Sequence, residues 1–156
     1  MHFYLVQHGA AKPESEDRER PLTDEGRRTI EKMAAWLKSA GVWVDRIERS
    51  DKLRARQTAE ILAAGLNTPE GTRQVSCLAP NDDVGPTVSR LAKETKNLML
   101  VGHLPYLSRL VAQLIGVPAD QIVVQFRTGG VVRIDRNEAG NWVIQWAVVP
   151  ELLPPA

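Results

Sequence analysis

The sequence predicts an α/β protein in which helices cover both faces of a central, mostly parallel sheet. Short apolar runs typical of buried strands alternate with longer segments whose apolar residues recur at helical spacing. Residues 3–6 and 98–101 are apolar throughout, as expected of parallel strands that are covered on both faces. The last strand-like runs instead follow one another as a hairpin. We therefore expect a three-layer α/β/α domain with antiparallel C-terminal strands at the edge of its sheet.

Length, charge and cysteine content narrow the class of protein further. A chain of 156 residues is long enough for one sizeable core, and we expect residues 1–156 to form a single domain. Because 20 Lys and Arg balance 19 Asp and Glu, the net charge of +1 gives no reason to expect nucleic acid as a partner. Cys77 is the single cysteine, and no stretch has the pattern of a signal peptide or the length of a membrane span. We expect a cytoplasmic protein that does not associate with membranes.

The first strand ends in Gln7, His8 and Gly9. In open α/β sheets, ligands bind at the edge formed by the carboxyl ends of the parallel strands. His8 is therefore expected at this edge, and Gly9 leaves room for a ligand or another part of the backbone to approach closely. The charged segment that follows, residues 10–21, is expected to be a loop.

The middle of the chain contains further alternating helices and strands. Thr23 suits the N-cap of a helix whose first turn is acidic and which is expected to stop near Gly41. The elements expected next are a strand over residues 42–50, a helix over 52–62, a short edge strand at 75–78 and a helix over 84–95. Arg54 falls in the first turn of the helix over 52–62, where a cation opposes the helix dipole. Either an anion lies nearby or Arg54 is a tolerated surface arginine.

The second central strand, residues 98–101, ends in Gly102 and His103 and so repeats the pattern of the first. Pro105 suits the first turn of a helix that runs to about residue 115. The remaining expected elements are a strand over residues 122–126 and a hairpin formed by residues 131–135 and 142–148. Two histidines at the ends of two central strands indicate a shared functional site rather than two structural histidines.

The combined order of four motifs resembles the histidine phosphatase superfamily. The motifs are His8-Gly9, Arg-Pro-Leu-Thr at residues 20–23, Ser50 with Arg-Ala-Arg-Gln-Thr at 54–58, and Gly102-His103. The likeness extends from Tyr4 to about Trp146, and the short chain looks most like the SixA-type phosphohistidine phosphatases, with their phosphoglycerate-mutase-like fold. The resemblance implies a phosphatase in which His8 attacks phosphorus and becomes phosphohistidine.

The same resemblance implies roles for other residues. Arg54 corresponds to an arginine that clamps phosphate, and its fork suits two phosphate oxygens. His103 corresponds to the second histidine, which stabilises the transferring phosphoryl group. The amide of Leu104 is a further donor because it lies near a helix N-terminus. Arg20 is another phosphate-binding candidate, the alternative being a solvated loop arginine.

One position departs from the family pattern. Gln7 stands where the family has an arginine, and together with Gly9 it completes the expected phosphate-binding residues. The Gln7 amide can donate hydrogen bonds to phosphate but carries no charge, and a hydrogen bond to a charged group contributes about 1.5–3 kcal/mol. Arg20 or Arg56 is expected to compensate in part. The alternative is a phosphate- or phosphoprotein-binding module in which Gln7 has weakened catalysis.

The short segment from residue 67 to 84 predicts an open pocket, which suits a phosphorylated side chain on a protein. Phosphohistidine is the expected substrate and inorganic phosphate the product, with a small-molecule phosphomonoester as the alternative substrate. Asp82 and Asp83 are the nearest candidates for the acid that an alcohol leaving group needs, the alternative being a solvated loop pair. Imidazole can leave as a neutral molecule, so phosphohistidine needs this acid less. The sequence has no cluster with metal-ligand spacing, and we expect neither a metal nor a cofactor.

Overall fold

The structure is a computed structural model and describes residues 1–155. Its strands form one six-stranded sheet in the order β3-β2-β4-β1-β5-β6. The strands are β1 (His2–Gln7), β2 (Arg46–Arg49), β3 (Thr72–Gln74), β4 (Leu98–Gly102), β5 (Val131–Arg136) and β6 (Trp142–Val148). The helices are α1 (Asp24–Ser39), α2 (Leu53–Leu66), α3 (Gly85–Lys93), α4 (Tyr106–Ile115) and the short 3₁₀ helix η1 (Pro150–Leu152). The first four strands run parallel, and β5 and β6 are antiparallel at one edge.

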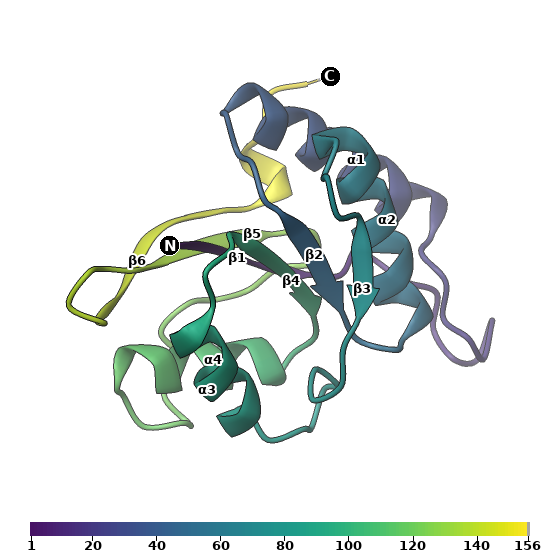
Figure 1. The fold of residues 1–156 in the computed structure, drawn as a ribbon. Helices are drawn as coiled ribbons and strands as arrows, with labels where there is room; N and C mark the ends of the chain where they lie inside the picture. Colours follow the sequence, from purple (N-terminus) through teal and green to yellow (C-terminus); the bar gives the residue numbers. More distant parts are fainter. Residues whose placement is uncertain (156) are drawn as a thin grey trace.

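Figure 1 shows α1 and α2 on one face of the sheet and α3 and α4 on the other. The expected three-layer α/β/α architecture, mostly parallel with antiparallel C-terminal strands, is therefore confirmed. Strand β1 supplies both cores, because Tyr4 and Val6 pack toward α1 and α2 whereas Phe3 and Leu5 pack toward α3 and α4. Burying a side chain such as Leu5 contributes about 1.5–3 kcal/mol. Packing on both faces thus fixes β1 and the residues at its carboxyl end.

Helix α1 begins where the sequence predicts. Thr23 is its N-cap, and its hydroxyl oxygen accepts the N–H of Gly26 at 2.9 Å. A Cβ atom at Gly26 would lie 2.2 Å from the carbonyl oxygen of Ala10, so only glycine lets the loop over residues 10–21 pack on this first turn. Neither α1 nor any other helix within residues 1–155 combines the length and apolarity needed to cross a membrane.

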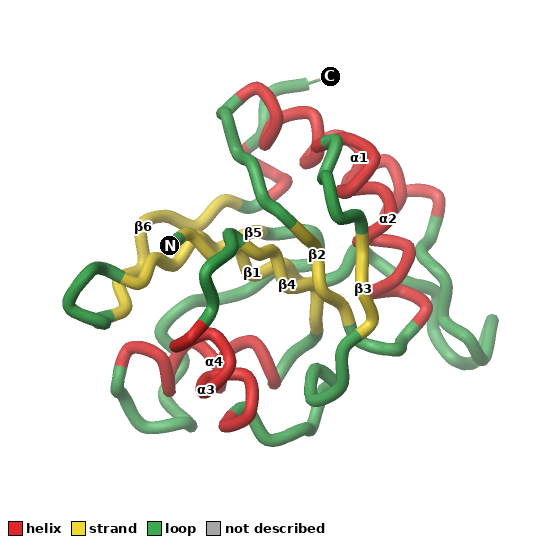
Figure 2. The backbone as a smooth tube through the Cα atoms, viewed as in Figure 1, coloured by secondary structure: helices red, strands yellow, loops and turns green. Residues whose placement is uncertain are grey.

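Two of the strands expected from the sequence are wrong. One lies at other residues than predicted, and the other does not form. Strand β3 lies at Thr72–Gln74 rather than at residues 75–78, because pairing with β2 aligns Ile47 with Thr72. Residues 122–126 form no strand, and Figure 2 draws the whole connection between α4 and β5 as loop. Strand β1 is already paired with β4 on one side and β5 on the other, so this segment finds no free strand in the centre of the sheet. Ile122 is accordingly 66% exposed.

Strand β2 is shorter than the apolar pattern suggested and begins at Arg46 rather than at residue 42. The amide of Asp45 bonds the carbonyl of Asn97 at 2.8 Å, just ahead of the regular ladder with β4. On the α3 face of β2, buried Glu48 pairs with Arg46 at 2.9 Å and with Arg90 at 2.7 Å. These contacts fix the end of β2 and therefore the position of Ser50, which follows it.

Candidate active site

The parallel pairing of β1 and β4 brings the two predicted histidines together. Gln7 is aligned with Gly102 in this ladder, and the amide of His8 donates to the carbonyl of Gly102 at 3.1 Å. His8 and His103 are the next residues of the two strands, and their ring centroids lie 5.0 Å apart. Residues separated by 95 positions in the sequence thus meet at the carboxyl edge of the sheet.

His8 is held as a neutral ring with one free nitrogen. Its Nδ1 lies 2.7 Å from the carbonyl oxygen of Gly9, and because a carbonyl only accepts, Nδ1 carries the proton and donates. Burial lowers the pKa of His8 to about 4, and the charges of Arg54 and Arg20 act in the same direction, against the hydrogen bond to Gly9. At neutral pH, Nε2 of His8 therefore has a free lone pair, as a nucleophile requires.

His103 is 1% exposed and lies against Ser50, whose Oγ is 2.6 Å from Nε2. Its other ring nitrogen, Nδ1, is buried and has no hydrogen-bond partner among residues 1–155. Burial lowers the pKa of His103 to about 3, and the nearby His8 and Arg54 lower it further. A neutral His103 thus presents an unpaired polar atom at the same edge as His8.

Arg54 lies in the first turn of α2, as the sequence predicted, and its Nε is buried without a partner among the described residues. Burial lowers the pKa of Arg54 from its ordinary value, the charge of Arg20 adds to this effect, and Asp51 opposes it. An arginine with unused donors beside a second arginine is a site for an anion with several oxygens.

Thr58 connects Arg54 to the residue after His8. The Thr58 hydroxyl donates to the carbonyl of Arg54 at 2.8 Å and accepts the N–H of Gly9 at 3.0 Å. Thr58 is fully buried, and its bond to the amide of Gly9 is shielded from water. The hydroxyl therefore fixes the start of α2 relative to the end of β1.

Arg20 reaches the site from the loop over residues 10–21. Its Nε donates to the carbonyl of Lys12 at 3.1 Å, which orients the side chain, and its charge depresses the pKa of His8, His103 and Arg54 alike. The loop is held against α2 because the amide of Leu22 donates to Oε1 of Gln57 at 2.8 Å. A cavity of about 560 Å³ opens beside it, lined by Glu14, Arg18, Glu19, Arg20, Asp51, Lys52, Leu53, Arg54 and Arg56.

The other predicted phosphate-binding residues are Gln7, Gly9 and Leu104, and they differ in whether their polar groups already have hydrogen-bond partners. Oε1 of Gln7 is buried and unpaired among residues 1–155, and no hydrogen bond from the amide of Leu104 is found within this part of the chain. The amide of Gly9 is already engaged by Thr58, and a Cβ atom at Gly9 would lie 2.9 Å from Ile30. A side chain at Gly9 would thus clash with Ile30, and the carbonyl of Gly9 accepts the hydrogen bond from His8. Arg56 is half-exposed and pairs with Glu60 at 3.6 Å.

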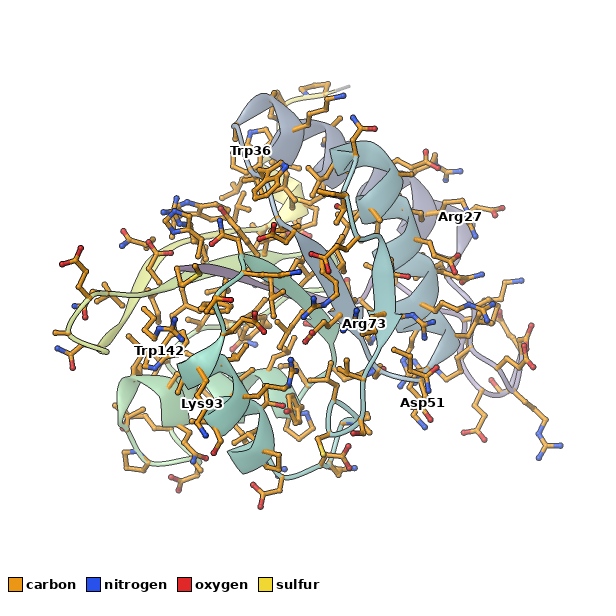
Figure 3. All side chains as sticks on the ribbon, in the orientation of Figure 1. Arg27, Trp36, Asp51, Arg73, Lys93 and Trp142 are labelled. Atoms are coloured by element: carbon orange, nitrogen blue, oxygen red, sulfur yellow. The ribbon has the colours of Figure 1, made fainter. Side chains whose placement is uncertain are left out.

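Each of the two loop carboxylates accepts one backbone hydrogen bond on one of its oxygens. An oxygen of Asp82 accepts the amide of Ala79 at 3.0 Å, and an oxygen of Asp83 accepts the amide of Gly85 at 2.8 Å. Asp82 and Asp51 both line a second cavity of about 350 Å³. Figure 3 labels Asp51 at the edge of the sheet toward which the parallel strands of Figure 1 point. Residues 1–155 hold no group of three or more His, Cys, Asp or Glu side chains arranged for a metal ion.

No functional role was predicted for Ser50 or Thr58, although both lie in the motifs that carry the resemblance. Two signals could have found them. Ser50 follows a strand as His8 and His103 do, and Thr58 lies one helical turn after Arg54. Which groups their hydroxyls bond depends on how the strands pair.

The fold and the site define an α/β protein in which two neutral histidines and two arginines at the carboxyl edge of the sheet suit an anion with several oxygens. The pattern of the histidine phosphatase superfamily (branch 1) matches residues 3–75. Phosphohistidine phosphatase SixA of Escherichia coli (strain K12) is 32% identical over 155 residues, which are 96% of this chain and 94% of that protein. The chain therefore belongs to the histidine phosphatase superfamily, and its enzyme class is that of a phosphatase.

Solved structures agree with this assignment. The structure of the protein histidine phosphatase SixA complexed with tungstate matches with a TM-score of 0.88 and 31% identity, covering 99% of this chain and 100% of that one. The alpha-ribazole phosphatase from Shigella flexneri matches with a TM-score of 0.79 at 18% identity, covering 93% of this chain and 95% of that one. The second likeness concerns the fold alone.

Proposed function

We propose that this phosphatase removes phosphate from phosphohistidine on a protein, through a covalent phosphohistidine intermediate at His8. The observation that carries the proposal is the hydrogen bond from Nδ1–H of His8 to the carbonyl of Gly9. It leaves Nε2 unprotonated in a ring that is neutral at the pH of the cell.

In the first step, Nε2 of His8 attacks phosphorus and forms the new N–P bond. The N–P bond of the substrate breaks, and its electron pair returns to the substrate nitrogen. Because the second nitrogen of the substrate ring is already protonated, the leaving group is a neutral histidine side chain. The step exchanges one phosphorylated imidazole for another and therefore needs no general acid.

In the second step, water attacks phosphorus and the N–P bond to His8 breaks. The electron pair returns to Nε2, both water protons stay with the released phosphate, and Nδ1–H remains bonded to Gly9. His8 is thereby restored to its starting tautomer. The hydrogen bond to Gly9 thus serves both steps, because it keeps the proton on the nitrogen that does not react.

The surrounding donors stabilise the phosphoryl oxygens in this proposal. Arg54 supplies charge and a fork of donors, and Arg20 adds a second charge nearby. His103 contributes a ring N–H, Leu104 its amide and Gln7 its side-chain amide. Phosphoryl transfer depends mainly on such positioning and electrostatics, and the substrate class is supported by the similarity to phosphohistidine phosphatase SixA.

The test is transfer of ³²P from a phosphohistidine-containing protein to the enzyme. Rapid quenching of the wild type should trap an acid-labile, base-stable label on His8, with or without EDTA. His8→Asn should abolish labelling and turnover, whereas His2→Asn, a matched change at a half-exposed histidine that begins β1, should retain both. Undiminished turnover by His8→Asn would overturn the nucleophile assignment. Faster turnover of a small phosphomonoester than of phosphohistidine would overturn the substrate class.

A further inference from the structure

The shortest polar contact within the site is made by a residue that has no proposed contact with phosphate. Oγ of Ser50 lies 2.6 Å from Nε2 of His103. Both residues are 1% exposed, so water does not compete for the bond. The direction of this hydrogen bond decides which nitrogen of His103 carries the proton.

The direction follows from the other partner of Ser50. The amide of Lys52 donates to Oγ of Ser50 at 3.3 Å, so one lone pair of this oxygen is already used. The hydroxyl has one proton to donate, and Nε2 of His103 is the one acceptor within its reach among residues 1–155. The buried hydroxyl therefore donates to Nε2, because the reverse direction would leave its own proton without an acceptor.

A nitrogen that accepts a hydrogen bond has no proton. The ring of His103 is neutral, since burial and the charges of Arg54 and Lys52 hold its pKa far below neutrality, at about 3. Its single proton must then lie on Nδ1, the atom that is buried without a partner in this part of the chain. His103 would thus carry a free N–H on a ring whose centroid lies 5.0 Å from that of His8.

We propose that Ser50 is a positioning residue, whose hydroxyl fixes His103 in the Nδ1–H tautomer and so presents Nδ1–H to the transferring phosphoryl group. In the other tautomer, a lone pair on Nδ1 would face the phosphoryl oxygens and repel them. The catalytic half of this inference rests on the proposed function, whereas the tautomer itself does not.

Long-range ¹H–¹⁵N correlation spectra of the ligand-free wild type test the tautomer without any assay, because protonated and unprotonated ring nitrogens resonate in different regions. Nε2 of His103 should be unprotonated and Nδ1 protonated. Ser50→Ala should shift His103 toward a mixture of tautomers or toward Nε2–H, and Ser50→Thr, which keeps the hydroxyl, should retain the wild-type spectrum. A protonated Nε2 in the wild type, or an unchanged spectrum in Ser50→Ala, would overturn the assignment.

Kinetics test the catalytic half. Ser50→Ala should lower kcat about threefold to tenfold with a smaller change in KM, the effect expected for one mispositioned neutral donor. Ser50→Thr should restore most of the loss. In a His103→Gln background, Ser50→Ala should have no further effect on kcat, because Ser50 acts through His103. If the two substitutions instead lowered kcat additively, the role of Ser50 would be purely structural. If the protein lacked phosphatase activity altogether, the proposed function would fail and the spectra would still decide the tautomer.

Discussion

The hydroxyl oxygen of Thr58 lies 3.0 Å from the amide nitrogen of Gly9 and accepts its N–H. The same hydroxyl donates to the carbonyl of Arg54 at 2.8 Å. One buried oxygen thus ties the strand end that carries His8 to the helical turn that carries Arg54. The spacing of the proposed nucleophile from the proposed phosphate clamp depends on it.

We expect Thr58→Val to lower both stability and activity. Valine has the shape of threonine but leaves the buried N–H of Gly9 without an acceptor, which costs about 1–3 kcal/mol in the free energy of unfolding. The loss of register between Gly9 and Arg54 should also lower kcat/KM. Thr58→Ser is the matched control, because it keeps both hydrogen bonds and loses one methyl group, at about 1 kcal/mol. Urea unfolding and steady-state kinetics check this, and equal losses of kcat/KM in both variants would contradict it.

Gln7→Arg tests how much the uncharged residue beside His8 limits the reaction. Oε1 of Gln7 is buried without a partner within residues 1–155, so replacing it breaks no hydrogen bond of this oxygen. In the proposed site, a guanidinium at this position would face the phosphoryl oxygens. We expect turnover to rise about tenfold, since about 1.4 kcal/mol of barrier corresponds to tenfold.

Two other outcomes of Gln7→Arg have different meanings. Tighter phosphate binding without faster turnover would indicate a binding module with a wider catalytic defect. A loss of both would indicate repulsion by Arg20, whose charge already reaches His8. Phosphate inhibition constants and kcat for the wild type, Gln7→Arg and the oppositely charged Gln7→Glu separate these cases.

Arg54→Ala should weaken inhibition by phosphate and lower kcat/KM by about tenfold to 100-fold, because charge-assisted hydrogen bonds contribute about 1.5–3 kcal/mol. Arg54→Lys should recover only part of this loss, since lysine keeps the charge but lacks the fork. Arg56→Ala removes the same charge two residues along α2, from an exposed side chain that pairs with Glu60. For Arg56→Ala, we expect phosphate inhibition and kcat/KM to change by less than about twofold. Equal effects of the alanine variants at positions 54 and 56 would show a general electrostatic field rather than a clamp.

The two site histidines make stability depend on pH. Burial lowers the pKa of His8 to about 4 and that of His103 to about 3, below the ordinary value of 6.5. Between about pH 6.5 and pH 4, the unfolded chain therefore binds protons that the folded protein does not bind. The free energy of unfolding should fall as the pH falls through this window.

Urea unfolding of the wild type and His103→Gln across this range checks the effect. The variant should lose less stability on acidification, because one of the two groups has been removed, while the carboxylates remain the same in both proteins. Parallel curves for the two proteins would show that His103 does not contribute to the acid sensitivity.

The features of this protein that depend on local pattern could be predicted from the sequence. Apolar runs followed by glycine and histidine predicted two buried strands with His8 and His103 at their ends, because a strand covered on both faces must be apolar throughout. Thr23 and the acidic turn after it likewise predicted the start of α1, since a helix N-terminus needs an acceptor for its free amides. The helical pattern over residues 52–62 likewise predicted that Arg54 lies in the first turn of a helix.

Which strands pair and which polar groups come into contact could not be predicted from the sequence. The placement of β3 at Thr72–Gln74 and the irregular course of residues 122–126 follow from the free edges that the sheet offers, and hydropathy carries no information about those. The bonds from Ser50 to His103 and from Gly9 to Thr58 join residues about fifty positions apart. They exist because β2, β4 and β1 lie side by side in parallel, so that their carboxyl ends and the start of α2 share one edge. A hydroxyl has the same chemistry wherever it lies in the sequence, and its partner is fixed only when packing removes water and leaves one acceptor within reach.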